Sequence, residues 1–195
     1  AVDNLCKNEF DHYRAKAEPH PMFIEHGIEA VPFAHEKMDE WRNNFKGIRF
    51  INEEAGYNFG GAVDDIWQKP SGELIVVDVK STSKNVFDWE DTYSKWEYAK
   101  GYQRQLEMYQ WLLEKNGFEV ASEGYLVYYN GKKHEPMFNQ QLTFDLHLVR
   151  LECDNSWVEE AVLNAKNTLD GDMPKPASSC ENCNYLRKRW EVSQK

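Results

Sequence analysis

Charged side chains interrupt two apolar stretches of the chain, where charge is least expected. The segment GGAVDDIW carries Asp64 and Asp65, and the segment ELIVVDVK carries Asp78 and Lys80. Ionised groups are rarely buried unless they are paired or bind a metal. Side chains two apart on a strand point the same way, so we expect Asp78 and Lys80 to share one face.

The turn-rich link QKPSG is of the right length to join the two segments as a hairpin. A hairpin folded about Ser71 places Asp64 opposite Asp78, with Cβ atoms about 4.5–5.5 Å apart. Carboxylates this close raise each other's pKa, and a divalent cation between them removes the repulsion. The pair therefore predicts a Mg²⁺-type site. Lys80, about two residues along, is placed to orient an attacking water or to meet negative charge on a phosphate.

The same residues are open to a structural interpretation. Asp78 and Lys80 could form a weak salt bridge on an exposed edge strand. The run ELIVVDV is apolar on both faces, however, which is typical of a buried central strand and favours the functional interpretation. Asp65 points to the opposite face by parity and is expected to be structural, although a one-residue slip in register would exchange its role with that of Asp64.

A helix expected over residues 95–116 carries a second set of candidates. Gln105 and Tyr109 are four residues apart and so lie on one helical face. A Gln can hydrogen-bond substrate or a metal-bound water, and a Tyr can stack or hold a phosphate. The alternative is an ordinary core stripe made of Tyr102, Leu106, Tyr109 and Leu113.

In this order the motifs resemble the PD-(D/E)XK nuclease superfamily, and within it the RecB-like branch that includes the CRISPR-associated exonucleases. That branch has Gly-x-x-Asp, then a hydrophobic strand that ends Asp-x-Lys, then Gln-x-x-x-Tyr on the following helix. The matching segments here are Gly61 to Asp64, Asp78 to Lys80 and Gln105 to Tyr109. Three linked motifs in order are far more specific than any one of them.

The resemblance implies metal-dependent hydrolysis of DNA phosphodiester bonds on a restriction-endonuclease-like core. Asp64 and Asp78, with the backbone carbonyl of Val79, would hold Mg²⁺ or Mn²⁺. Lys80 would position or activate the attacking water. The residues implied to be catalytic are Asp64, Asp78, Lys80, Gln105 and Tyr109. DNA is the expected substrate, as a single strand or a duplex end, in DNA processing or repair.

Many relatives supply a further metal ligand, a His, from an upstream helix. The helical pattern of AVDNLCKNEF sets Asp3 near that position, so Asp3 is a candidate oxygen replacement. Two alternatives remain open. Asp3 could be a solvated acid favoured by the helix dipole, and His35 is a rival ligand.

Some RecB-like nucleases hold an iron–sulfur cluster with one N-terminal Cys and three near the C-terminus. Here the tail supplies only Cys180 and Cys183, which is half of a tetrahedral site. Cys6 and Cys153 are expected to be buried structural thiols. We expect an iron–sulfur cluster or zinc only if a missing N-terminal segment supplies ligands. The chain begins Ala-Val-Asp without a Met and within an expected helix, which is consistent with a truncated N-terminus.

Basic and aromatic side chains suggest where DNA would lie. Lys100 and Arg104 share a helical face just before Gln105 and, with Lys84, are the principal candidates for phosphate contacts. Further basic candidates are Lys95, Lys132, Lys133 and the run Arg187-Lys188-Arg189. An aromatic group is open to two interpretations, as a platform for single-stranded bases or as a packed lid. It consists of Phe87, Trp89, Tyr93 and Trp96.

The composition of the 195 residues limits the partners. The net charge of −10 disfavours non-specific coating of DNA, and suggests tight metal dependence or delivery to DNA by a protein partner. No apolar run approaches the length of a membrane span. Four unevenly spaced cysteines do not make a disulfide scaffold, so a cytoplasmic location is expected.

The pattern of elements predicts an α/β fold with a central mixed sheet of about five strands flanked by helices. The expected helices are residues 1–17, 34–45, 95–116 and 155–169, and the strands are GIRFIN, 57–67, 73–81, EGYLVYYNG and LTFDLHLVRLE. Residues 83–94 are expected to be a loop. We expect a single nuclease-like domain over residues 1–195 with a Cys-bearing tail at about 171–195.

Two other functions remain alternatives to a nuclease. One is a non-catalytic nuclease-fold module that binds DNA or a protein. Such modules usually lose the Asp or the Lys, whereas this chain retains Asp64, Asp78 and Lys80. The other is a structural metal-binding domain organised by the tail cysteines.

Overall fold

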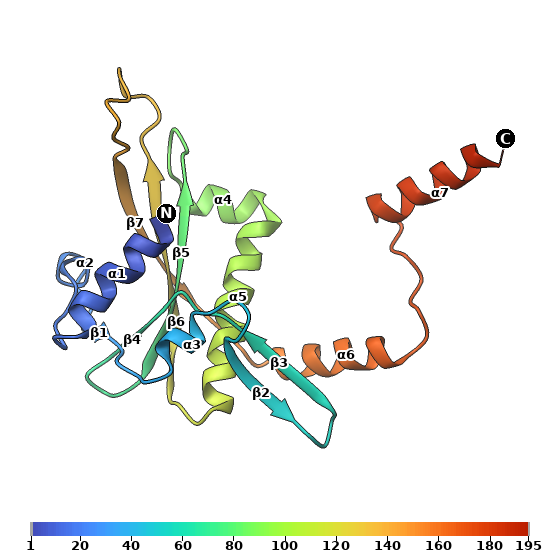
Figure 1. Ribbon diagram of the computed structural model, residues 1–195, viewed down its shortest axis with the longest axis horizontal. Coiled ribbons are helices and arrows are strands. Elements are labelled where there is room, and N and C mark those ends of the chain that lie inside the picture. The colour runs from blue at the N-terminus through green and yellow to red at the C-terminus, as the bar shows by residue number, and fades with distance from the viewer. Residues whose placement is uncertain (1, 195) are drawn as a thin grey trace. The chain divides into compact units, whose positions relative to one another are not determined.

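The computed structural model of the chain describes residues 2–194 (Figure 1). The chain divides into two compact units, Ala1–Val158 and Glu159–Lys195. The helices are α1 (Val2–Arg14), α2 (Pro21–Glu25), α3 (Met38–Trp41), α4 (Trp89–Lys95), α5 (Glu97–Lys115), α6 (Val158–Asp170) and α7 (Glu181–Ser193). The strands are β1 (Val31–Pro32), β2 (Ile48–Asn52), β3 (Tyr57–Gly61), β4 (Asp65–Gln68), β5 (Leu74–Thr82), β6 (Val120–Gly131) and β7 (Phe144–Glu152).

A mixed five-stranded sheet in the order β1-β4-β5-β6-β7 forms the centre of the first unit. Strands β5 and β6 are parallel, and the other neighbouring strands are antiparallel. The predicted α/β class with a central mixed sheet of five strands is confirmed. The middle position of β5 also confirms that ELIVVDV is a central strand, buried from Leu74 to Val79.

Helices cover both faces of this sheet. On one face, Cys6 and Phe10 of α1 join a buried cluster with Trp67, Val77 and Val127. On the other face lies α5, which contacts β5 and β6 (Figure 1). Successive strand residues alternate between faces. The odd-numbered residues of β5 therefore face α1, and Asp78 and Lys80 face α5.

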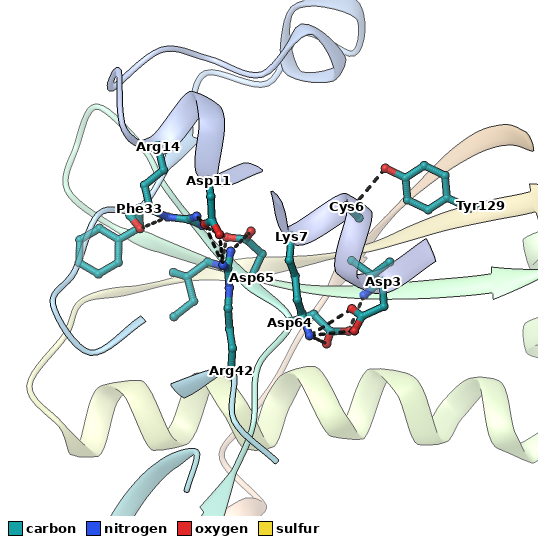
Figure 2. A network of polar contacts seen from close by, with 12 residues as sticks. Asp3, Cys6, Lys7, Asp11, Arg14, Phe33, Arg42, Asp64, Asp65 and Tyr129 are labelled. Atoms are coloured by element: carbon teal, nitrogen blue, oxygen red, sulfur yellow. Dashed lines mark hydrogen bonds and ion pairs between the residues drawn. The ribbon is translucent and has the colours of Figure 1, made fainter. Parts of the chain in front are cut away.

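A buried ion-pair network fastens α1 to the start of β4 (Figure 2). The carboxylate of Asp65 is fully buried and binds Arg14 through Oδ1 (2.5 Å) and Arg42 through Oδ2 (2.6 Å). Asp11 pairs with the same two guanidinium groups. Arg14 also donates from Nε to the carbonyl oxygen of Phe33 at 2.7 Å. These contacts agree with the structural role predicted for Asp65.

The expected strand over residues 57–67 is wrong, because it is two strands in two different sheets. Strand β3 pairs only with β2, and this two-stranded sheet contacts α5. A bend at residues 62–64 then leads into β4 of the main sheet. Trp111 of α5 packs against Phe50 and Phe59, which explains why the hairpin leaves the main sheet. GIRFIN is therefore β2 of this hairpin, and the short β1 takes its place as a strand of the main sheet.

Several helix predictions also need correction. Residues 89–95 of the expected loop form α4, because Asp88 caps it by accepting a hydrogen bond from the Asp91 N–H at 2.8 Å. The helix expected over 34–45 is reduced to α3. Pro21 occupies the first turn of the short helix α2, where its missing N–H is tolerated. Helix α7 was not predicted.

No helix among residues 2–194 is long and apolar enough to cross a membrane. The second unit holds most of α6 and all of α7. The expectation of one domain over residues 1–195 remains a prediction.

We predict that Asp65→Asn strongly destabilises the protein. The substitution removes the buried counter-charge of Arg14 and Arg42 and leaves them only the half-exposed carboxylate of Asp11. Breaking a buried pair in this way costs about 3–5 kcal/mol. Urea denaturation followed by circular dichroism measures the loss. The control is Asp145→Asn, which breaks an exposed pair with Lys132 and should leave the unfolding midpoint nearly unchanged. Equal losses in the two variants would contradict the prediction.

Candidate active site

The two predicted acids meet where β4 begins and β5 passes it. The register pairs Asp65 with Val77 and Gln68 with Leu74, so the hairpin is centred on Ser71 as predicted. Asp64 lies in the bend just before β4, and an extension of this register by one residue would set it across from Asp78. Their side chains interact closely enough that the charge of Asp64 affects the ionisation of Asp78.

Asp78 is buried in an unusual way for a carboxylate, with 2% of its surface exposed. Burial raises the pKa of Asp78 to about 6. The ammonium of Lys80 opposes this shift and the charge of Asp64 adds to it. Lys80 pairs with Asp78 Oδ2, yet this oxygen is buried and accepts no well-aligned hydrogen bond. Asp78 Oδ2 is therefore a buried anionic oxygen whose cationic partner is the Lys80 ammonium.

Asp64 has a partner on each of its oxygens. The N–H of Val79 donates to Oδ2 at 2.9 Å, and Lys7 Nζ lies 3.0 Å from Oδ1. Lys7 also lies 3.1 Å from both oxygens of Asp3, so its ammonium sits between two carboxylates (Figure 2). Burial acts to lower the pKa of Lys7, but the charges and hydrogen bonds of Asp64 and Asp3 outweigh it and raise the pKa. Lys7 therefore stays charged at neutral pH.

Lys80 is held from three sides. Besides its pair with Asp78, it donates from Nζ to Gln105 Oε1 at 3.3 Å and lies 4.3 Å above the ring of Tyr102. Gln105 Nε2 in turn donates to the Tyr109 hydroxyl oxygen at 2.8 Å. A continuous chain of contacts thus runs from Asp78 through Lys80 and Gln105 to Tyr109.

The end of β3 packs unusually close to this chain. A Cβ added to Gly61 would lie 2.5 Å from Tyr109 Cε1, far inside van der Waals contact. Glycine at this position therefore lets the strand pass directly over the tyrosine ring. Burial also raises the pKa of Tyr109, which keeps its hydroxyl protonated at neutral pH.

The structure thus brings together the five residues predicted to be catalytic, and it adds two that the sequence reasoning missed. Tyr102 had been placed only in a core stripe, and Lys7 had no assigned role. Lys7 follows Asp3 by four residues, so helical spacing could have shown that they share a face. Its contact with Asp64 required the tertiary structure.

Comparison with known proteins agrees with these motifs. Residues 1–187 match a family described as the PD-(D/E)XK nuclease superfamily. The chain belongs to this superfamily. A crystal structure of SSO0001 matches at 18% identity with a TM-score of 0.34, over 69% of this chain and 52% of that chain. This chain thus spans about half the length of that protein. No curated protein matches.

Superfamily membership is consistent with the restriction-endonuclease-like arrangement of the sheet and helices. PD-(D/E)XK proteins are typically nucleases that use Mg²⁺ or a similar divalent metal. The RecB-like branch remains a prediction.

The oxygen atoms at this PD-(D/E)XK site fit a hard divalent cation. Asp78 Oδ2 and Asp3 Oδ1 are buried and contact the ammonium groups of Lys80 and Lys7, and carboxylate and carbonyl oxygens are the ligands that Mg²⁺ prefers. No group of three or more His, Cys, Asp or Glu side chains among residues 2–194 is arranged to hold a metal. The fit therefore rests on the pair Asp64 and Asp78, and Asp3 and the Val79 carbonyl remain predicted ligands.

The rival ligand His35 has aromatic partners instead. Its ring stacks on Trp41 with centroids 4.3 Å apart and also contacts Phe33 and Phe118. These contacts explain the position of His35 without any metal.

The predicted DNA contacts have local partners. Lys100 and Arg104 both pair with Glu97, at 3.5 Å and 3.1 Å. Lys84 donates from Nζ to Thr92 Oγ1 at 2.6 Å, which ties it to α4. The structure does not link these three side chains to the carboxylates, so their roles remain predictions.

The aromatic residues divide into two groups. Phe87 stacks on His147 and contacts Tyr128, which Trp89 also contacts, so this part packs as a lid. The second group is a series of contacts from Trp96 through Tyr98 to Tyr102, in which Trp96 and Tyr98 are exposed. Trp96, with 55% of its surface exposed, contacts Tyr98, which contacts Tyr102 above Lys80.

The cysteines lie in both units. In the second unit, Cys180 caps α7 and accepts a hydrogen bond from the Cys183 N–H at 3.4 Å, which lowers the pKa of the Cys180 thiol. In the first unit, burial raises the pKa of Cys6 and of Cys153 to about 12, as expected for structural thiols. Binding of a cluster or zinc by Cys180 and Cys183 remains a prediction.

We predict that Gly61→Ala destabilises the protein by about 1–3 kcal/mol, because the new methyl group must displace the buried Tyr109 ring. Gly101→Ala is the matched control. Nothing lies within 4 Å of a Cβ at Gly101 of α5, and Ala in a helix is favoured over Gly by about 0.5–1 kcal/mol. Urea denaturation should give opposite signs for the two variants. A Gly61→Ala protein as stable as wild type would contradict the close packing.

Proposed function

We propose that this chain is a divalent-metal-dependent deoxyribonuclease, and specifically a RecB-like exonuclease that acts in DNA processing or repair. The observation that carries the proposal is the buried Asp78, beside Asp64 and in contact with Lys80, within a chain of the PD-(D/E)XK superfamily. A buried carboxylate such as Asp78, beside a second acid that is only partly exposed, is costly to fold unless it is used.

In this proposal Asp64 and Asp78 hold Mg²⁺ or Mn²⁺, with the Val79 carbonyl as a further ligand. A cation held there would supply Lewis acidity, lowering the pKa of water and offsetting negative charge at the phosphate. Lys80 hydrogen-bonds the attacking water or the negative charge that develops on the phosphate. Gln105 and Tyr102 keep the Lys80 ammonium at the site, and Tyr109 orients the Gln105 amide.

The exposed aromatic series suggests how a single strand would be guided. Trp96 and Tyr98 lead along the surface to Tyr102, which lies against Lys80. Unpaired bases stack on such side chains without sequence preference. Phosphate contacts from Lys84, Lys100 and Arg104 would add the positive charge that the chain lacks overall.

We expect Asp78→Asn to abolish metal-dependent cleavage of end-labelled DNA, and Lys80→Met to slow it by roughly 10²-fold or more. Asp39→Asn and Lys46→Met make the same chemical changes at exposed positions and should cleave like wild type. Single- and double-stranded DNA are tested with Mg²⁺, Mn²⁺ or EDTA.

Cleavage that persists in Asp78→Asn and Lys80→Met would show that the site is wrong or that a contaminant is cutting. No cleavage by wild type, combined with calorimetric Mn²⁺ binding that needs Asp78, would favour the alternative of a non-catalytic DNA- or protein-binding module.

We also predict that Trp96→Ala and Tyr98→Ala each weaken binding of a single-stranded oligonucleotide by about tenfold, because base stacking is lost. Fluorescence anisotropy in EDTA measures binding without cleavage. Phe45→Ala removes an exposed aromatic ring elsewhere and is the control. Unchanged affinity in both test variants would exclude the aromatic series as a platform for DNA.

A further inference from the structure

The Lys7 ammonium lies against the carboxylate of Asp64, where the proposed divalent cation would also bind. It lies 3.0 Å from Asp64 Oδ1, while Asp64 Oδ2 accepts the Val79 N–H. Both oxygens of Asp64 are therefore engaged before any metal binds. Lys7 is also largely shielded from water, with 18% of its side-chain surface exposed.

Charge at the site is balanced by lysines. Lys80 pairs with Asp78, and Lys7 pairs with Asp64 and Asp3. A divalent cation held by Asp64 and Asp78 would lie close to the Lys7 ammonium, and like charges at such distances repel by several kcal/mol even at an effective dielectric constant of about 20. The cation and the ammonium thus compete for Asp64.

We propose that Lys7 is an internal counter-ion of the metal site: its ammonium holds Asp64 while no divalent cation is bound, and withdraws onto Asp3 when one binds. This inference rests on the proposed function, since it requires a divalent cation at Asp64 and Asp78. It assigns Lys7 and Asp3 as positioning residues that act through Asp64.

Asp3 is well placed to receive the ammonium. It lies one helical turn before Lys7, and both of its oxygens are 3.1 Å from Lys7 Nζ. An i,i+4 pair of this kind can persist on the helix surface after the contact with Asp64 is lost. Its buried Oδ1 contacts Lys7 Nζ without an aligned hydrogen bond, so it has capacity for a better-aligned one. Asp3 therefore has a function here without ligating the metal.

The Lys7–Asp64 pair therefore stabilises the metal-free protein. The same pair makes metal binding weaker than it would be at Asp64 and Asp78 without Lys7. When a protein must leave a favoured state in order to bind, its apparent affinity falls by the fraction of molecules that are competent. Removing the Lys7 charge should therefore tighten metal binding and destabilise the metal-free protein.

We test this by titrating Mn²⁺ into the full chain in a calorimeter. Lys7→Met keeps the length of the side chain and removes its charge, and we expect its Kd for Mn²⁺ to fall by roughly tenfold. Lys7→Arg keeps the charge and should retain the wild-type Kd. Lys16→Met removes one exposed charge just after α1 and should also bind like wild type. Thermal melts confirm that each variant is folded, and Mn²⁺ should raise the Tm of Lys7→Met more than that of wild type.

A double-mutant cycle separates the two roles open to Asp3. If Asp3 acts through Lys7, Asp3→Asn weakens Mn²⁺ binding in the wild-type background and has no effect in Lys7→Met. If Asp3 is a metal ligand, it weakens binding equally in both backgrounds, and this result would overturn the role assigned to Asp3.

The outcomes distinguish this inference from the proposed function. Mn²⁺ binding that needs Asp78, with the same or weaker affinity in folded Lys7→Met, would overturn the counter-ion role of Lys7 and leave the nuclease proposal intact. No Mn²⁺ binding by wild type or Lys7→Met would overturn the metal site and this inference with it.

Discussion

The candidate site depends on how α1 is held against the start of β4. Two consecutive aspartates point to opposite faces there, and α1 supplies a cation to each: Arg14 to Asp65 and Lys7 to Asp64 (Figure 2). The Asp65 pair is fully buried and shared with Arg42, so the helix cannot shift without exposing an uncompensated charge. This constraint fixes the position of Lys7 relative to Asp64, while the β4–β5 pairing fixes Asp64 relative to Asp78.

Asp65 and Asp78 are both aspartates buried in apolar strands, but they serve two different purposes. Asp65 has a guanidinium partner for each of its oxygens, and its environment is that of a structural ion pair. Burial raises the pKa of both acids, but Asp78 has a single lysine as its ion-pair partner and lies beside a second carboxylate, Asp64, whose charge raises its pKa further. A protein accepts such a group at a cost in stability when the group has a function. Asp65 thus lies on the α1 face of the sheet, whereas Asp78 and Lys80 lie on the α5 face, and Asp64 at the start of β4 is reached by Lys7 of α1.

The hairpin register and the helical spacing were predictable because both depend on local geometry. Side chains alternate along a strand and repeat every four residues along a helix, which placed Asp64 opposite Asp78 and Gln105 beside Tyr109. Which strands belong to the main sheet was not predictable in the same way. Residues 57–67 were expected to be one strand, and only the contact between Gly61 and Tyr109 and the packing of Trp111 show why the chain leaves one sheet and enters another.

The sequence by itself determined the class of fold, the superfamily motifs, the acid pair with its lysine, and the parity that separates Asp64 from Asp65. Each of these follows from the period of a strand or a helix, or from the cost of placing charge in an apolar segment. Only the tertiary structure decided which cations meet those acids. Lys7 and Asp64 are 57 positions apart in the chain, and no local rule relates them. Their contact exists because the buried Arg14–Asp65 pair fixes where the helix lies on the sheet.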